Sequence, residues 1–256
     1  MQHIWLIAAL LLGGCVTADV VTPDIVRDIA PNGRLRAAMN YGNTVLVQHG
    51  SEPRGVSPDI ARELARRLGM PLDFIPYDAA GKVSADATRG AWDIAFLARD
   101  PERAKEIQFT APYVVIEGAY LVRDDSPLKT NEDVDRAGVR ISVSRASAYD
   151  LYLSRTIKQA TLVRASSPPA SIELFAKERL EAVAGVKQPL LAYAASHPGY
   201  RVLPGRFMVI EQALAIPRGR PLAARYLADF IDELKASGFV AAALEKSGQR
   251  DAAVAP

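Results

Sequence analysis

The sequence predicts an α/β protein built from two β/α lobes that are joined by two hinge strands. Apolar runs of strand length alternate with helical segments from residue 33 onwards, as in open α/β sheets. The alternation pauses near residue 122, and a second set of similar size begins at Arg123. An extended apolar run at 207–217 then leads into helical segments, which we expect to return to the first lobe.

The first lobe is predicted to contain three strands and two helical connections. The strands lie at 35–39, 71–77 and 92–98, and the connections lie at 57–68 and 78–90. The third strand is apolar nearly throughout, as a central parallel strand should be. The helix that begins near Ser57, its candidate N-cap, is the clearest one. Apolar residues recur along it at helical spacing, and Gly69 is placed to end it.

The second lobe repeats this pattern, with strands at 139–143, 161–164 and 180–185. Two strands are expected to bridge the lobes, near 120–123 and near 211–215, and such a hinge lets two lobes close over a small ligand. The predicted division of the chain is a leader at 1–18, a linker at 19–32, a first lobe at 33–122 plus 216–256, and a second lobe at 123–215.

Composition excludes several classes of function. The chain has 256 residues and a net charge of +2, so it lacks the basic field that nucleic-acid binding requires. Its three histidines are scattered, and glycine-rich phosphate-binding loops are absent, so we expect neither a metal nor another cofactor. We expect a monomer.

The N-terminus resembles an export signal. Residues 4–12 form an apolar run that is too short to span a bilayer. Val16-Thr17-Ala18 fits a signal-peptidase site, whereas Leu12-Gly13-Gly14-Cys15 fits a bacterial lipobox in which Cys15 is lipidated. Both processing sites predict that the protein is exported from the cytoplasm. Cleavage by signal peptidase would release it into the periplasm or the extracellular space, whereas lipidation of Cys15 would anchor it to a membrane. Cys15 is the only cysteine, so no intrachain disulfide can form.

The best candidate for a binding residue is Arg103, which lies in a polar turn just after the strand at 92–98. A guanidinium group at the end of a buried strand is well placed to hold a small anion. The alternative role is a surface salt bridge with Glu106 or Asp100.

A second candidate segment follows the strand at 35–39. Small and amide residues are found there, namely Asn40, Tyr41 and Asn43. Ligands of open α/β sheets bind outside the carboxyl ends of the strands, so we expect this loop to contact the ligand. The alternative is a plain turn.

An ordered series of short motifs resembles one known family. These motifs are Gly33–Leu35, Gly55–Ala61, Leu68-Gly69, Gly90–Asp93, Glu102–Ala104 and Phe109–Tyr113. In this order they resemble the bacterial extracellular solute-binding proteins of family 3, the amino-acid-binding components of ABC transporters, over about 34–248. The resemblance implies a two-lobed type II periplasmic-binding-protein fold. It also implies that the protein captures a small carboxylate-bearing solute, an amino acid or related organic acid, and delivers it to the membrane subunits of an ABC transporter.

The resemblance further implies which residues hold the ligand. Arg103 would pair with the ligand's α-carboxylate through two charge-assisted hydrogen bonds. Backbone groups of the preceding strand would add to this clamp, at Phe96, Leu97 and Ala98. Backbone N–H groups at a helix N-terminus of the second lobe would complete the anion site, at Ser147, Ala148 and Tyr149.

One departure from the family concerns the group that holds the ammonium of an amino acid. Members usually carry an aspartate shortly after a strand of the second lobe, but here Val186-Lys187-Gln188 follows that strand. Lys187 would repel an ammonium and attract a second anionic group; the alternative role is that of a solvated surface lysine. The ligand is then either a carboxylate without a nearby ammonium, such as a dicarboxylate, or an amino acid whose ammonium binds Glu117 or Glu211.

Two other functions are compatible with the same fold. A cyclohexadienyl-dehydratase-like enzyme would need an acid in the cleft, for which Glu117, Glu211 and Glu181 are candidates. A sensor subunit would present its ligand to a membrane receptor instead of a transporter. We favour a binding protein without enzymatic activity.

Overall fold

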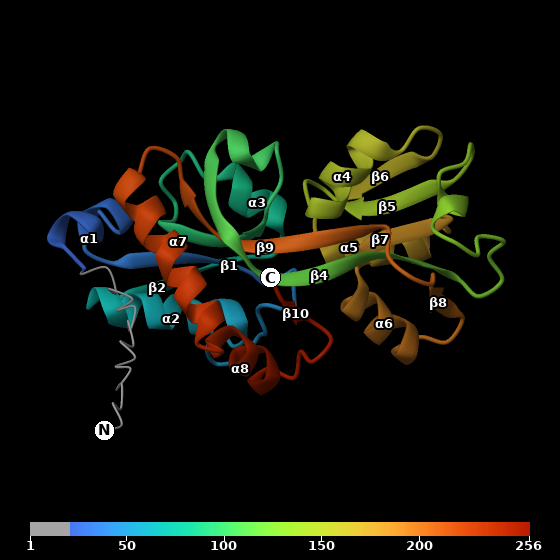
Figure 1. The fold of residues 1–256 in the computed structure, drawn as a ribbon. Helices are drawn as coiled ribbons and strands as arrows, with labels where there is room; N and C mark the ends of the chain where they lie inside the picture. Colours follow the sequence, from blue (N-terminus) through green and yellow to red (C-terminus); the bar gives the residue numbers. More distant parts are fainter. Residues whose placement is uncertain (1–20) are drawn as a thin grey trace, which may run out of the picture.

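The computed structural model describes residues 21–256, so the predicted leader and Cys15 lie outside the described residues. The chain forms two α/β lobes that lie side by side (Figure 1). Two long strands, β4 (Ile107–Arg123) and β9 (Met208–Pro217), run from one lobe into the other. One sheet of ten strands therefore passes through the molecule. The predicted two-lobed α/β fold with two connecting strands is confirmed.

The first lobe contains the strand order β2-β1-β3-β9. Its parallel strands are β1 (Leu35–Asn40), β2 (Leu72–Tyr77) and β3 (Ile94–Ala98). Its helices are α1 (Pro23–Ile29), α2 (Val56–Leu68), α3 (Ala80–Ala85), α7 (Pro221–Ala236) and α8 (Phe239–Lys246). The helical connection predicted at 78–90 is thus much shorter. The end of the chain lies in this lobe as α7 and α8. The short β10 (Ala253–Val254) pairs with β4.

The second lobe continues the sheet in the order β4-β7-β5-β6. Its strands are β5 (Arg140–Ser144), β6 (Thr161–Ala165), β7 (Ala182–Val186) and β8 (Tyr200–Val202). Its helices are α4 (Ala148–Thr156), α5 (Pro168–Lys177) and α6 (Lys187–Ser196). Two single 3₁₀ turns complete the described elements, η1 (Arg103–Lys105) in the first lobe and η2 (Glu132–Val134) in the second.

The strand pairing locates the crossing between the lobes. Gln212 of β9 still pairs with Ala98 of the first lobe, whereas Gly118 of β4 already pairs with Val186 of the second lobe. The lobes therefore meet over these few residues of β4 and β9.

The predicted linker at 19–32 contains a helix that is part of the first lobe. Ile29 at the end of α1 is fully buried. The Ile29 carbonyl accepts a hydrogen bond from Arg220 Nη1 at 3.0 Å, and Asp28 Oδ2 accepts one from the backbone N–H of Ala223 at 2.8 Å. The segment is thereby fixed to the start of α7.

The start of α2 differs from its prediction. Gly55, not Ser57, is the N-cap, and its φ of 115° lies outside the range that other residues adopt readily. A Cβ at Gly55 would also lie 2.4 Å from the carbonyl oxygen of Leu46. Ser57 lies inside the helix, where its hydroxyl forms a buried hydrogen bond of 2.8 Å with the hydroxyl of Tyr113. Gly69 ends the helix in the left-handed conformation, as predicted.

The exposed face of α2 contains a charge cluster with a testable pH dependence. Glu63 accepts hydrogen bonds of 2.8 Å from Arg66 and Arg67, and the Arg66 bond contributes most to lowering the Glu63 pKa to about 2. A lowered folded-state pKa stabilises the fold above the unfolded value, and this stabilisation is lost as pH falls towards the folded value. Glu63→Gln should lower the free energy of unfolding by about 1 kcal/mol at pH 7. Urea unfolding should show this deficit shrinking between pH 5 and pH 3; a deficit that does not change with pH would contradict it.

Candidate ligand-binding site

A pocket lies between the two lobes, at the carboxyl ends of the parallel strands. The first lobe contributes β3 and the loop after β1, β9 contributes its crossing segment, and the second lobe contributes β7 and the starts of α4, α5 and α6. About 60 Å³ is open to the centres of water molecules. One water needs about 10–15 Å³ by this measure, so the pocket has room for several waters or a small organic molecule.

Arg103 is the charged residue among the described residues that line this pocket. It lies in η1 just after β3, and only 4% of its surface is exposed. Its Nη1 donates to the Ala98 carbonyl and its Nη2 donates to the Ala146 carbonyl, both at 2.9 Å, while the buried Nε has no partner. Burial lowers the Arg103 pKa to about 10, so the group is still ionised at neutral pH. Asp100, one of the predicted salt-bridge partners, is instead bonded to Arg155 at 2.8 Å.

The second lobe places the N-terminus of α4 on the pocket. Ser147 is the N-cap, and its hydroxyl accepts a hydrogen bond from the backbone N–H of Asp150 at 3.1 Å. The N–H groups of Ala148 and Tyr149 lie in the first turn, where helix geometry provides no acceptor. Both residues line the pocket, and first-turn N–H groups of this kind can donate to an anion.

Neutral polar groups surround the same space. The Tyr149 hydroxyl and Asn43 Oδ1 are buried without a hydrogen-bond partner. Tyr149 lies close to the hydroxyls of Ser144 and Ser147 but meets hydrogen-bond geometry with neither, and burial raises its pKa to about 12. Its hydroxyl is therefore protonated at neutral pH and can donate to a ligand.

The end of β1 and the loop after it contribute two of the three residues predicted there to this pocket. Asn40 and Asn43 line it, and Asn40 Oδ1 accepts a hydrogen bond from the backbone of Gly42 at 3.1 Å. Tyr41 lies beside a neighbouring groove, where its ring stacks on His49 with centroids 4.2 Å apart. A ligand in the main pocket would therefore meet the asparagines and not Tyr41.

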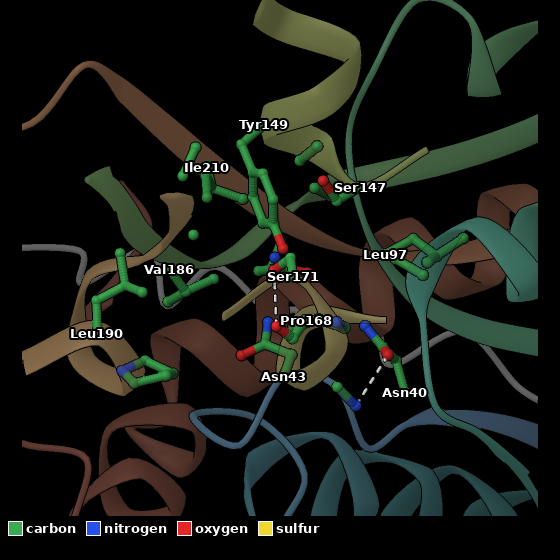
Figure 2. A pocket seen from close by; sticks show the side chains of 18 of the residues that line it. Asn40, Asn43, Leu97, Ser147, Tyr149, Pro168, Ser171, Val186, Leu190 and Ile210 are labelled. Carbon is green, nitrogen blue, oxygen red and sulfur yellow. Dashed lines mark hydrogen bonds between the residues drawn. The ribbon is translucent and has the colours of Figure 1, made fainter. Parts of the chain in front are cut away.

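Much of the pocket wall is apolar. Figure 2 shows Val186, Leu190 and Ile210 on one side of the pocket, with Leu97 on the opposite side. The ring of Tyr149 reaches between them from α4. Three of these residues, Val186, Leu190 and Ile210, were not among the sequence candidates, and neither were Ser171 and Gln212, which also line the pocket.

Lys187 and Glu117 do not line the pocket. They bond to each other, with 2.7 Å between Lys187 Nζ and Glu117 Oε2, and Arg206 Nη1 lies 2.7 Å from the other carboxylate oxygen. The hydrogen bond from Lys187, followed by that from Arg206, lowers the pKa of Glu117. The structure thus places a closed ion cluster where the sequence suggested two separate ligand contacts. Val186, the last residue of β7, lines the pocket, whereas Lys187, the first residue of α6, does not.

The other candidate acids are also engaged away from the pocket. Glu211 forms a half-exposed ion pair with Arg99 at 3.2 Å. Glu181 accepts hydrogen bonds from the side chain of Arg140, at 2.9 Å, and from its backbone. Within residues 21–256, no group of three or more metal-binding side chains is present, and no helix is long and apolar enough to cross a membrane.

Several contacts across the pocket hold the lobes together. Arg103 bonds to the carbonyl of Ala146 in the second lobe, and Asp100 pairs with Arg155 of α4. Gly81 of α3 packs so closely on the second lobe that a Cβ would lie 2.6 Å from the carbonyl oxygen of Arg145. The arrangement is that of two lobes closed over the pocket.

The ion pair between Asp100 and Arg155 is expected to contribute to closure. The Asp100 side chain is almost buried, whereas the Arg155 side chain is 41% exposed, so the pair is partly screened by solvent. Arg155→Met should weaken ligand affinity by about threefold to tenfold, mainly through faster dissociation. Stopped-flow kinetics would measure this, and an unchanged dissociation rate would show that the pair does not stabilise the closed state.

Comparison with known proteins identifies the family. The model of the bacterial extracellular solute-binding proteins, family 3, matches residues 36–249. The chain belongs to this family. The resemblance inferred from the motifs is confirmed, and the extracellular character of the family agrees with the predicted export. A comparison with curated protein sequences found no match.

Solved structures share the fold of this family 3 protein at low sequence identity. The P235GK mutant of ArgBP from T. maritima is 21% identical with a TM-score of 0.75, over 88% of this chain and 100% of that one. A solute receptor for L-cysteine of Neisseria gonorrhoeae is 20% identical with a TM-score of 0.76, over 87% and 92%. An ancestral amino-acid-binding protein, a precursor of cyclohexadienyl dehydratase, is 21% identical with a TM-score of 0.72, over 86% and 98%.

Proposed function

We propose that this family 3 protein captures a small carboxylate-bearing solute, an amino acid or related organic acid, and delivers it to the membrane subunits of an ABC transporter. The observation that carries the proposal is the buried guanidinium of Arg103, which has a free Nε donor and, within residues 21–256, hydrogen bonds only to two backbone carbonyls. The nearby Asp100 carboxylate favours its charge but is itself bonded to Arg155, so no carboxylate in the described chain is bonded to Arg103. A buried charge without a counter-charge is unfavourable. A ligand carboxylate would supply that counter-charge.

The surrounding groups suit the same ligand. A guanidinium can hold a carboxylate by two parallel hydrogen bonds, and the first-turn N–H groups of α4 add donors from the opposite lobe. Because the donors come from both lobes, the ligand would stabilise the closed form. Ligand-dependent closure is what a transporter could recognise. Export of the protein, either as a soluble chain or anchored by a lipid on Cys15, is part of this proposal.

The dehydratase alternative has less support. Its candidate acids Glu117, Glu211 and Glu181 are each paired with arginine or lysine, and none of them lines the pocket. The pocket offers no carboxylic acid, among residues 21–256, that could transfer a proton to a bound substrate. A binding protein without enzymatic activity fits these contacts better. A ligand-presenting sensor would use the same pocket and differ only in its membrane partner.

A thermal-shift screen of small acids and amino acids tests the proposal. A ligand at a hundredfold over its dissociation constant should stabilise the protein by about 2.7 kcal/mol. Each acid that shifts the melting temperature is paired with its own primary amide, which keeps the shape and removes the charge. We expect the acid to bind and the amide to fail. A panel in which no carboxylate binds, or in which amides bind equally well, would overturn the proposal.

A further inference from the structure

We propose that the ligand is a monocarboxylate whose remaining body is neutral and mostly apolar, with no ammonium group. This inference rests on the proposed function and narrows the solute class of the same site.

The described residues that line the pocket include one positively charged side chain and no negatively charged one. Of the pocket-lining residues in the described chain, Arg103 alone has a charged side chain. The remaining polar side chains there are neutral amides and hydroxyls, namely Asn40, Asn43, Ser147, Tyr149, Ser171 and Gln212. One bound carboxylate would bring the net charge of the filled pocket to zero.

A ligand with an ammonium group would leave the filled pocket with a net positive charge. With the carboxylate on Arg103, the ammonium of an α-amino acid would be an extra positive charge in a closed pocket, and burying an unpaired charge is costly. Asn43 Oδ1 is a free acceptor, but a neutral oxygen supplies a hydrogen bond without compensating the charge. The position at the end of β7 that faces the pocket is Val186, and Leu190 and Ile210 lie beside it (Figure 2). The side chains at this position are therefore apolar, whereas binding an ammonium group would require an acidic one.

A second carboxylate is disfavoured for the opposite reason, because four cations of the second lobe are already paired. Lys187 and Arg206 both bind Glu117. Arg155 binds Asp100, and the Arg164 Nε lies 2.9 Å from Asp150 Oδ1. A dicarboxylate would therefore carry one charge that only neutral donors could meet.

Neutral oxygen substituents are compatible with the site. The Tyr149 hydroxyl can donate and Asn43 Oδ1 can accept, and neither has a partner in the structure. A 2-hydroxy or 2-oxo group could therefore replace the ammonium without adding charge. The body beyond it would contact Leu97, Leu190 and Ile210.

Matched ligand pairs test the inference on the wild-type protein. Calorimetry would compare 3-methylbutanoate with valine, 4-methylpentanoate with leucine, and 2-hydroxy-4-methylpentanoate with leucine, with succinate as the dicarboxylate. We expect the acid to bind at least about thirtyfold more tightly than its amino-acid partner, and succinate to bind as weakly as the amino acids. An amino acid that binds as tightly as its acid overturns this inference but leaves the proposed function intact. If no member of any pair binds and the broad acid screen is also negative, the proposed function fails as well.

A charge introduced at Val186 provides a second test. Val186 is the N-cap of α6 and makes no capping hydrogen bond, so both aspartate and asparagine are favourable there. Val186→Asp should increase affinity for leucine by at least about tenfold relative to wild type, because its carboxylate can pair with the ammonium. Val186→Asn, which can form the same cap without the charge, should give no such gain. A folded Val186→Asp variant with no gain, or an equal gain in both variants, would show that the missing charge at this wall does not determine selectivity.

Discussion

Replacing Arg103 by methionine should lower the affinity for the carboxylate ligand by at least about a hundredfold, because the main charge-assisted hydrogen bonds are lost. The stability of the unliganded protein should change little. Methionine removes a desolvated charge, whose cost is visible in the lowered pKa of Arg103. It also leaves the carbonyls of Ala98 and Ala146 without their donor, which costs about 1–3 kcal/mol for each buried group. These two effects oppose each other.

Calorimetry and thermal unfolding of the same preparations would separate affinity from stability. Arg103→Lys keeps the charge without the two-pronged donor, so it should retain part of the affinity. Arg99→Met is the matched control, because Arg99 forms a half-exposed pair with Glu211 and does not line the pocket. An Arg103→Met protein that is folded and binds as tightly as wild type would contradict the assignment of Arg103 to the ligand.

Placing a valine at Gly81 should weaken ligand binding by at least about tenfold without unfolding either lobe. In the closed form a Cβ at this position would lie 2.6 Å from the Arg145 carbonyl oxygen and 2.9 Å from the Ala146 Cβ, both in the opposite lobe. Because Gly81 lies in α3, a residue with a side chain is at least as compatible with the helix as glycine. The substitution therefore opposes closure while it leaves the first lobe intact.

Small-angle scattering would provide the structural readout for this variant. With saturating ligand, the wild type should become more compact, and Gly81→Val should not. Ser84→Ala on the same helix is the control, because the Ser84 hydroxyl bonds only to carbonyls of α3. A Gly81→Val protein that compacts and binds like wild type would mean that ligand binding does not require the contact at this position.

The features of the fold that could be predicted are those that depend on residues close together in the sequence. The apolar run that became β3, the helix that Gly69 ends and the placement of Arg103 after a strand are all local patterns. The N-cap of α2 was assigned wrongly to Ser57, since its hydroxyl has a long-range partner in Tyr113. Helix α6 was missed because its apolar residues show little helical periodicity and Pro189 lies near its start.

The site was predicted less completely because it is assembled from distant segments. Gln212 interrupts an apolar strand, yet only the closure of two lobes shows that it meets Asn43 and Tyr149 around one pocket. The sequence also drew attention to Lys187, although the adjacent Val186 is the residue that lines the pocket. The sequence shows that a charged residue is present at position 187, but only the fold determines the direction of its side chain.

The return of the chain to the first lobe sets an order for its folding. In the first lobe β3 lies between β1 and β9, and α1 is bonded to the start of α7, so the core of this lobe stays open until residues beyond 217 have emerged. The second lobe lies within a continuous stretch of chain between β4 and β9. Domains fold as units during synthesis. We therefore expect the lobe that contains Arg103 to be completed last, although its first strand comes early in the chain.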